Sequence, residues 1–149
     1  TPCGSRRCGA LLVVDSNLWI YYSDSTLPEH ATVRSYLDPA LRGEVVGVNT
    51  VIQMEVAHYL VKRLGSSAGL AKARMFLGLD IEIDSLDPAR AVEAVKQLAR
   101  YSDVGIGGRD ATVLATLRGL GTNRLATHDE SFRRVDWVRV EDPLGAQGT

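Results

Sequence analysis

Apolar residues gather along the chain in short runs separated by polar turns, and these runs predict five strands. The first run, Leu11-Leu12-Val13-Val14, is followed directly by Asp15. Continuous aliphatic runs of this length are typical of strands buried on both faces of a parallel sheet. The other strands are expected at residues 44–49, 80–84, 124–127 and 137–141. The strand at 80–84 alternates apolar and polar residues, which places it near an edge of the sheet.

Between the strands, the spacing of apolar residues predicts helices. They are expected at about residues 17–22, 29–38, 50–64, 70–77, 88–99 and 109–118. Strands that alternate with helices indicate an α/β fold in which helices flank a doubly wound parallel sheet of about five strands.

Caps and apolar stripes define these helices further. Thr50 and Gln53 have the spacing of a capping box, and Pro88 suits the first turn of a helix. The helix at 29–38 has few apolar positions, so we expect it at the surface or against a partner, ending at Pro39 and Gly43. Two helices carry stripes expected to face the core. These are Met54, Ala57, Val61 and Leu64 in the helix at 50–64, and Ala91, Val92, Val95, Leu98 and Ala99 in the helix at 88–99.

The composition is that of one ordinary globular domain. The 149 residues are 45% hydrophobic and 23% charged. We expect a single domain over residues 10–143, with flexible segments at 1–9 and 144–149. No apolar run approaches ~18 residues and no secretory signal is recognisable, so a cytoplasmic protein without a membrane span is expected.

Charge and cysteine content exclude some classes of site. The net charge of −1 argues against a surface that coats nucleic acid indiscriminately, although a local basic rim remains open. Arg133 and Arg134 are candidates for contacts with RNA phosphates, and a solvated turn is their alternative. Cys3 and Cys8 cannot complete a four-ligand zinc site, and we assign them no role.

Four carboxylates fall where strands end or the following helices begin: Asp15, Glu55, Asp110 and Asp129. Each also has a local explanation. The three aspartates are suited to capping the helix or turn that follows, and Glu55 to pairing with Lys62 or Tyr59 on a solvated face.

Two features favour a shared site over four separate local roles. Asp110 shares an i, i+3, i+4, i+7 stripe with Val113, Leu114 and Leu117, so it faces the core. In a parallel α/β sheet, the carboxyl ends of neighbouring strands meet at one crevice. Carboxylates that converge there repel each other by roughly 1–4 kcal/mol per close pair. A hard divalent cation such as Mg²⁺ offsets that repulsion, so the pattern predicts a metal site.

The segments around these acids resemble the acidic motifs of PIN domains. They read LVVDSN (residues 12–17), NTVIQME (49–55), GGRDA (107–111) and LATHDESF (125–132). Their order and spacing are most similar to the VapC-type toxins of toxin–antitoxin modules, over residues 11–143. The resemblance implies an endoribonuclease that depends on Mg²⁺ or Mn²⁺, is usually a homodimer and is held inactive by an antitoxin.

By this resemblance, Asp15, Glu55, Asp110 and Asp129 are the metal-binding and catalytic acids, with Asn17 and Thr127 as hydrogen-bonding supports. His58 and His128 receive no role, and Asp103 is the rival of Asp110. We expect Asp15 and Asp110 as direct ligands of one or two ions and RNA as the substrate.

Three other functions remain open at this stage. A phosphatase of the haloacid dehalogenase type needs a second acid two residues after Asp15, where this chain has Asn17. A receiver domain that binds Mg²⁺ and accepts a phosphoryl group needs a lysine after a late strand, and none occurs there. The third is a PIN-like scaffold without catalytic activity.

Overall fold

A computed structural model describes residues 11–145, and its centre is a parallel sheet of five strands. The strand order is β3-β2-β1-β4-β5, and every neighbouring pair is parallel. The strands are β1 (Leu12–Val14), β2 (Val46–Asn49), β3 (Glu82–Asp84), β4 (Arg124–Ala126) and β5 (Arg139–Glu141). The predicted α/β fold is confirmed, with the most apolar strand at the centre and β3 at an edge.

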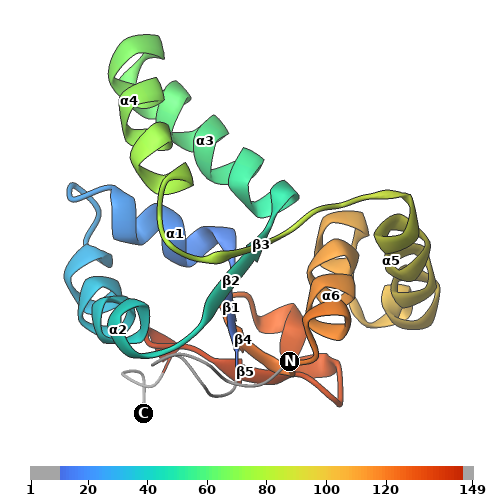
Figure 1. The fold of residues 1–149 in the computed structure, drawn as a ribbon. Coiled ribbons are helices and arrows are strands. Elements are labelled where there is room, and N and C mark those ends of the chain that lie inside the picture. Colours follow the sequence, from blue (N-terminus) through green and yellow to red (C-terminus); the bar gives the residue numbers. More distant parts are fainter. Residues whose placement is uncertain (1–10, 146–149) are drawn as a thin grey trace.

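Helices cover both sides of this sheet (Figure 1). They are α1 (Ser16–Ser23), α2 (His30–Gly43), α3 (Thr50–Leu64), α4 (Ser66–Leu77), α5 (Pro88–Tyr101) and α6 (Gly108–Leu120), with short 3₁₀ helices η1 (Ser102–Val104) and η2 (Glu130–Arg134). In Figure 1, α1 and α2 lie on one side, α5 and α6 on the other, and α3 and α4 form a hairpin that projects from the body.

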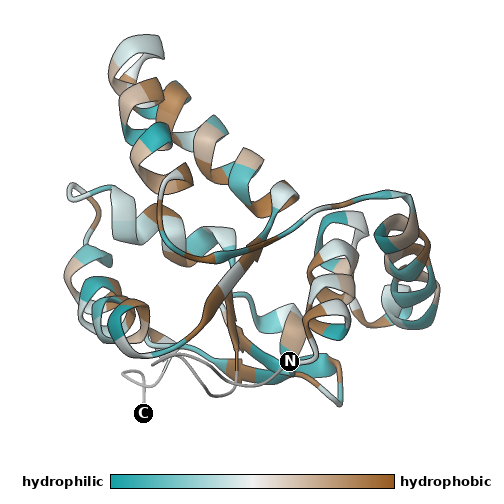
Figure 2. Cartoon of the chain, in the orientation of Figure 1, coloured by the Kyte–Doolittle hydropathy of each residue, from teal (hydrophilic) through white to brown (hydrophobic). Residues whose placement is uncertain are grey.

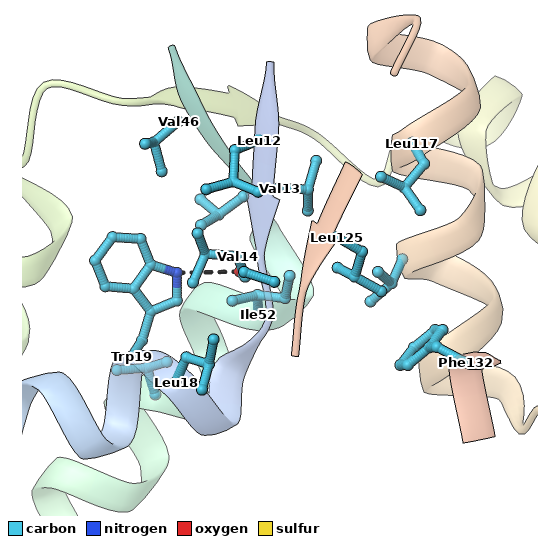
Figure 3. Close-up of a cluster of buried hydrophobic side chains, with 14 of the residues drawn as sticks. Leu12, Val13, Val14, Leu18, Trp19, Val46, Ile52, Leu117, Leu125 and Phe132 are labelled. Atoms are coloured by element: carbon cyan, nitrogen blue, oxygen red, sulfur yellow. Dashed lines mark hydrogen bonds between the residues drawn. The ribbon is translucent and has the colours of Figure 1, made fainter. Parts of the chain in front are cut away.

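The core lies around β1, whose three residues are fully buried, and the central strands are correspondingly hydrophobic in Figure 2. Trp19 of α1 is the largest fully buried side chain, and its indole N–H donates to the Val14 carbonyl at 3.1 Å (Figure 3). This bond satisfies the one polar group of the indole, which would otherwise be costly to bury. It also fixes α1 directly against the end of β1.

Successive strands are added on opposite sides of β1, so the strand order reverses there. From β1, the chain moves to β2 and then β3 on one side, whereas β4 and β5 lie on the other. Ligands of open α/β sheets bind at such a switch point, beyond the carboxyl ends of the strands. Asp15 is the first residue after β1, at this position.

The start and the buried face of α3 differ from the sequence prediction. Asn49, and not Thr50, is the cap, since its side chain accepts from the Ile52 N–H at 2.7 Å. Thr50 instead accepts from the Leu86 N–H. Met54 is 68% exposed, and the buried stripe is Ile52, Val56 and Leu60. Both stripes have helical spacing, so periodicity alone did not identify the one that packs.

The apolar stripe predicted for α5 is also wrong. Val92 and Val95 are exposed, whereas Ala94, Gln97 and Tyr101 are buried. This helix packs against α6, which is buried along residues 111–117. The stripe that repeats best in the sequence therefore lies at the surface of the single chain.

Helix α2 continues through Pro39 to Gly43, although we expected it to end near that proline. A proline inside a helix removes one N–H donor and crowds the preceding turn. Leu37 and Ala40 flank Pro39 and are buried, so packing against the body compensates. Among residues 11–145, no helix combines the length and apolar character that a membrane span needs.

Candidate active site

Asp15 is the centre of the site and is completely buried. It caps α1, with Oδ1 accepting from the Ser16 N–H at 2.8 Å. Oδ2 accepts from the Thr127 hydroxyl at 2.8 Å. The predicted cap is therefore confirmed, but capping uses only one of the two carboxylate oxygens.

One guanidinium, that of Arg109, contacts three of the predicted acids. Its Nη1 and Nη2 lie 3.0 and 3.1 Å from Oδ1 of Asp15, and Nη2 lies 3.3 Å from Oδ2. Its Nε lies 3.3 Å from Oε2 of Glu55 and 3.5 Å from Oδ1 of Asp110. The acids on β1, α3 and α6 therefore converge on one cation, and we call Asp15, Glu55 and Asp110 the acidic cluster.

Glu55 and Asp110 reach this cluster from the N-terminal parts of α3 and α6. Asp110 is in the first turn of α6, where the N-cap residue is Gly107, and its carboxylate accepts a hydrogen bond from the Gly107 backbone. Tyr59, one of the two local partners expected for Glu55 beside Lys62, instead donates its hydroxyl to Asp24 at 2.6 Å. One oxygen of Glu55, Oε1, is buried without a hydrogen-bond partner among the described residues.

Asn17, Thr127 and Asp129 form a second layer around Asp15. While donating to Asp15, the Thr127 hydroxyl accepts from Asn17 Nδ2 at 3.3 Å and from the Asp129 N–H at 3.0 Å. Asn17 and Thr127 thus lie where supporting residues were predicted. The Asp129 carboxylate caps η2 through the Ser131 N–H and hydroxyl, so its local explanation holds in this arrangement.

Burial raises the pKa of Asp15, against the opposing effects of Arg109 and of hydrogen bonds from Thr127 and Ser16. Burial is also the main cause of the raised pKa values of Glu55 and Asp110, and Arg109 again opposes it. The Asp129 charge further raises the pKa of Asp15 and Asp110. Ionising the cluster is therefore costly, and additional positive charge would relieve that cost.

The donor set suits a hard divalent cation, although the present arrangement does not enclose one. Among residues 11–145, no three His, Cys, Asp or Glu side chains stand close enough together to hold a metal ion. Arg109 lies between the acids instead. Carboxylate oxygens are the ligands that Mg²⁺ and Mn²⁺ prefer, and the unpartnered Oε1 of Glu55 has capacity to spare. The acidic cluster, with Asp129 beside it, therefore fits such an ion in chemistry.

The other predicted residues lie around the cluster rather than in it. Arg133 is half exposed and pairs with Glu130 at 3.5 Å, and Arg134 donates to the Val104 carbonyl. His128 pairs with Asp142 at 2.9 Å. Asp103, the rival of Asp110, is exposed in η1. Cys3 and Cys8, with residues 1–9 as a whole, lie outside the described residues.

Arg109 is the residue that sequence reasoning missed. It directly precedes Asp110, but adjacency does not reveal a contact with Asp15, 94 positions away. An arginine at the start of a helix is unfavourable for the helix dipole, and that mismatch was the available signal.

Comparisons with known proteins show which proteins this chain resembles in sequence and fold. The chain is 28% identical to Ribonuclease VapC26 of Mycobacterium tuberculosis over 119 residues, covering 79% of this chain and 86% of that protein. The crystal structure of VapC20 from the same organism, described as a sarcin-ricin loop cleaving toxin, has a TM-score of 0.70 at 21% identity, covering 85% of this chain and 96% of that one. The crystal structure of VapBC2 from Rickettsia felis, bound to a promoter DNA fragment, has a TM-score of 0.71 at 14% identity. The match covers 89% of this chain and 98% of that one.

The sequence profile of the PIN domain matches residues 12–138, a span that includes all four predicted acids and their supporting residues. The chain belongs to the PIN domain family.

Proposed function

We propose that this protein is an endoribonuclease that depends on Mg²⁺ or Mn²⁺ and acts as the toxin of a VapBC-type pair. The observation that carries the proposal is the convergence of Asp15, Glu55 and Asp110 on one cation at the switch point of the sheet. Membership of the PIN domain family and similarity to a protein named a ribonuclease support the same chemistry.

Hydrogen bonds from the surrounding residues fix the orientation of the Asp15 carboxylate that would bind an ion. The Ser16 N–H and the Thr127 hydroxyl hold its two oxygens in fixed directions, and Asn17 orients that hydroxyl. Asp15 and Asp110 would be direct ligands, with Glu55 and Asp129 completing the shell directly or through water. When bound, the ion would activate water and stabilise the charge on the attacked phosphate.

Space for a substrate lies beside the cluster. A cavity of about 420 Å³ shares Ser16 and Glu55 with the site and continues along the apolar side chains of Ile20, Val51 and Met54. His58 is a further lining residue. Arg133 and Arg134, on η2 directly after Asp129, would contact the phosphates of an RNA strand bound at the acidic cluster.

Exposed apolar side chains support the expectation of protein partners. Leu70 and Met75 on α4, and Val92 and Val95 on α5, are between 46% and 69% exposed. Clustered apolar exposure of this kind marks interaction surfaces. We propose that one surface forms a homodimer and that a cognate antitoxin covers another, in the cytoplasm. The similarity to VapBC2 of Rickettsia felis supports the antitoxin.

The test is incubation with a panel of single-stranded and structured RNAs in Mg²⁺ or Mn²⁺, with excess EDTA in parallel. Asp15→Asn is the matched inactive variant, because asparagine can still cap α1 while the charge is lost. We expect cleavage by the parent only with metal, and none by the variant. Cleavage that persists in EDTA refutes the metal mechanism, and no cleavage of any RNA favours a non-catalytic scaffold.

A further inference from the structure

The position of Arg109 has a consequence for how an ion enters the site. Its guanidinium touches all three members of the acidic cluster, at 3.0 to 3.5 Å, and its side chain is only 29% exposed. Each contacted acid comes from a different element, β1 or its end, α3 and α6. In this state Arg109 is the counter-ion that holds the three elements together at the site.

On Asp15, the same contacts compete with a metal ion for the carboxylate oxygens. Oδ1 of Asp15 already accepts from Ser16 and from two guanidinium nitrogens, and Oδ2 accepts from Thr127 and from Nη2. Mg²⁺ requires its oxygen ligands at about 2.0–2.1 Å, so it must take the lone pairs that the guanidinium uses. Two cations on one carboxylate oxygen would also repel each other.

The spacing of the acids leads to the same conclusion. No three of these side chains stand close enough to enclose an ion within the described part of the chain, and the planar guanidinium lies between them. Its departure would let the carboxylates close around a smaller cation. Arginine has a long, flexible side chain and cannot lose its proton, so it can leave only by rotating away.

We propose that Arg109 is a built-in cation of the metal-free site, and that a divalent ion binds by displacing its guanidinium from Asp15. This inference rests on the proposed metal site. It predicts that the parent protein binds metal more weakly than its carboxylates alone would allow, because each binding event breaks the Arg109 contacts.

Calorimetric titration with Mn²⁺ at neutral pH tests this directly on the whole chain. The variants are Arg109→Gln, which removes the charge, and Arg109→Lys, which keeps a charge but lacks the planar set of donors that bridges several carboxylates. Arg74→Gln is the matched control, since Arg74 is exposed on α4 and the charge change is the same. We expect Arg109→Gln to bind Mn²⁺ about tenfold more tightly than the parent, with Arg109→Lys in between and the control unchanged.

Thermal unfolding gives a readout that is independent of cleavage. Without metal, Arg109→Gln should melt below the parent, because the acidic cluster loses its counter-ion. On adding Mn²⁺, its midpoint should rise by more than that of the parent, since no internal cation has to be displaced. If Arg109 is a static part of the metal-loaded site, removing it leaves Mn²⁺ affinity unchanged or weakened, and the displacement inference is then wrong.

Two further outcomes are decided separately. If the parent binds no Mn²⁺ at all, the proposed metal function itself fails. If Arg109→Gln does not fold, the Nη–Hη signal of Arg109 in the ¹⁵N-labelled parent decides, because Nη1 and Nη2 make the contacts to Asp15. Titration with Mg²⁺ should shift that signal and expose its protons to exchange as the contacts to Asp15 break. A signal that stays protected in Mg²⁺-saturated protein overturns the inference.

Discussion

At the scale of single residues, a substitution of Asp110 distinguishes a functional carboxylate from one that only caps a helix. Its side chain is 16% exposed, lies 3.5 Å from Arg109 and has a pKa that burial raises. Because its charged form is disfavoured in the metal-free fold, removing the charge costs little stability. We predict that Asp110→Asn abolishes RNA cleavage while the metal-free protein melts at the parent temperature or above.

Asp103→Asn is the matched control, since it makes the same charge change at an exposed position three residues before Ile106. Cleavage assays and metal-free melting curves of both variants give the comparison. The prediction is wrong if Asp110→Asn stays active, or if it is destabilised by the ~1 kcal/mol that loss of a helix cap typically costs.

The sequence predicted single residues well where local pattern determines their position. Asp15 follows the most apolar run of the chain, so its place at the end of the central strand was predictable. Thr127 and Asn17 were expected near it through a resemblance, and the structure joins them by hydrogen bonds. The convergence of Asp15 and Glu55 was expected, but Arg109 was missed because no sequence pattern shows that its side chain lies between them.

At the scale of elements, helical periodicity showed which residues share a face but not which face is buried. Helix α3 carries one apolar stripe through Met54 and another through Ile52, Val56 and Leu60, and the body of the protein covers the second. The stripe of α5 was equally regular, yet Val92 and Val95 face outwards. Such choices depend on tertiary contacts that a single helix does not encode.

The hairpin of α3 and α4 depends on the absence of a side chain at Gly69. A Cβ at this position would lie 2.5 Å from the Val61 Cα and 2.6 Å from the Leu60 carbonyl oxygen. Backbone atoms cannot yield as a flexible side chain does, so the two helices would have to separate. We predict that Gly69→Ala lowers the free energy of unfolding by roughly 1–3 kcal/mol, as overpacking typically does.

Gly43→Ala is the control, because Gly43 ends α2 and a Cβ there meets nothing within 4 Å. Urea unfolding of the two variants measures the difference. Equal stability of Gly69→Ala and the parent would show that the hairpin packs more loosely than described.

Asp24 links the end of α1 to α3 and makes stability depend on pH. Hydrogen bonds from Thr26 and from Tyr59 of α3 lower its pKa from 3.8 to about 2. A lowered pKa in the folded state stabilises the protein above the unfolded pKa, and that contribution is lost as pH falls from 3.8 towards 2. We predict that Asp24→Asn is less stable than the parent at neutral pH, by about 2 kcal/mol.

The difference between Asp24→Asn and the parent should shrink as the pH is lowered through this window. Chemical unfolding at a series of pH values measures it, with Asp103→Asn as a comparison variant that makes the same charge change at an exposed position. A difference that remains constant down to pH 2 would contradict the assignment.

At the scale of the whole molecule, the α/β class with its doubly wound parallel sheet was the most predictable property. Five short apolar segments alternating with helices leave few parallel arrangements, and the observed order places β1 between β2 and β4. Membership of the PIN domain family separates the chain from the receiver and phosphatase classes that composition alone left open. The helix expected at the surface or against a partner, α2, buries Val33 and Leu37, so the proposed dimer rests on the exposed apolar residues of α4 and α5.

We predict that Val95→Glu weakens self-association, because a charge would then lie in the apolar surface of α5, where Val95 is 64% exposed. Ser35→Glu places the same charge at an exposed position of α2 and serves as the control. Light scattering at high micromolar concentration should give a dimer for the parent and the control, and a monomer for Val95→Glu. A monomeric parent at this concentration would refute the homodimer.

The central claim is that the acidic cluster binds the metal on which RNA cleavage depends. The most direct measurement is a titration of metal-free protein with Mn²⁺ in which bound Mn²⁺, by electron paramagnetic resonance, and the RNA cleavage rate are followed in the same samples. Our account predicts that the rate rises in proportion to bound Mn²⁺, and that Asp15→Asn loses both. A cleavage rate that is already maximal before any Mn²⁺ is bound would contradict it.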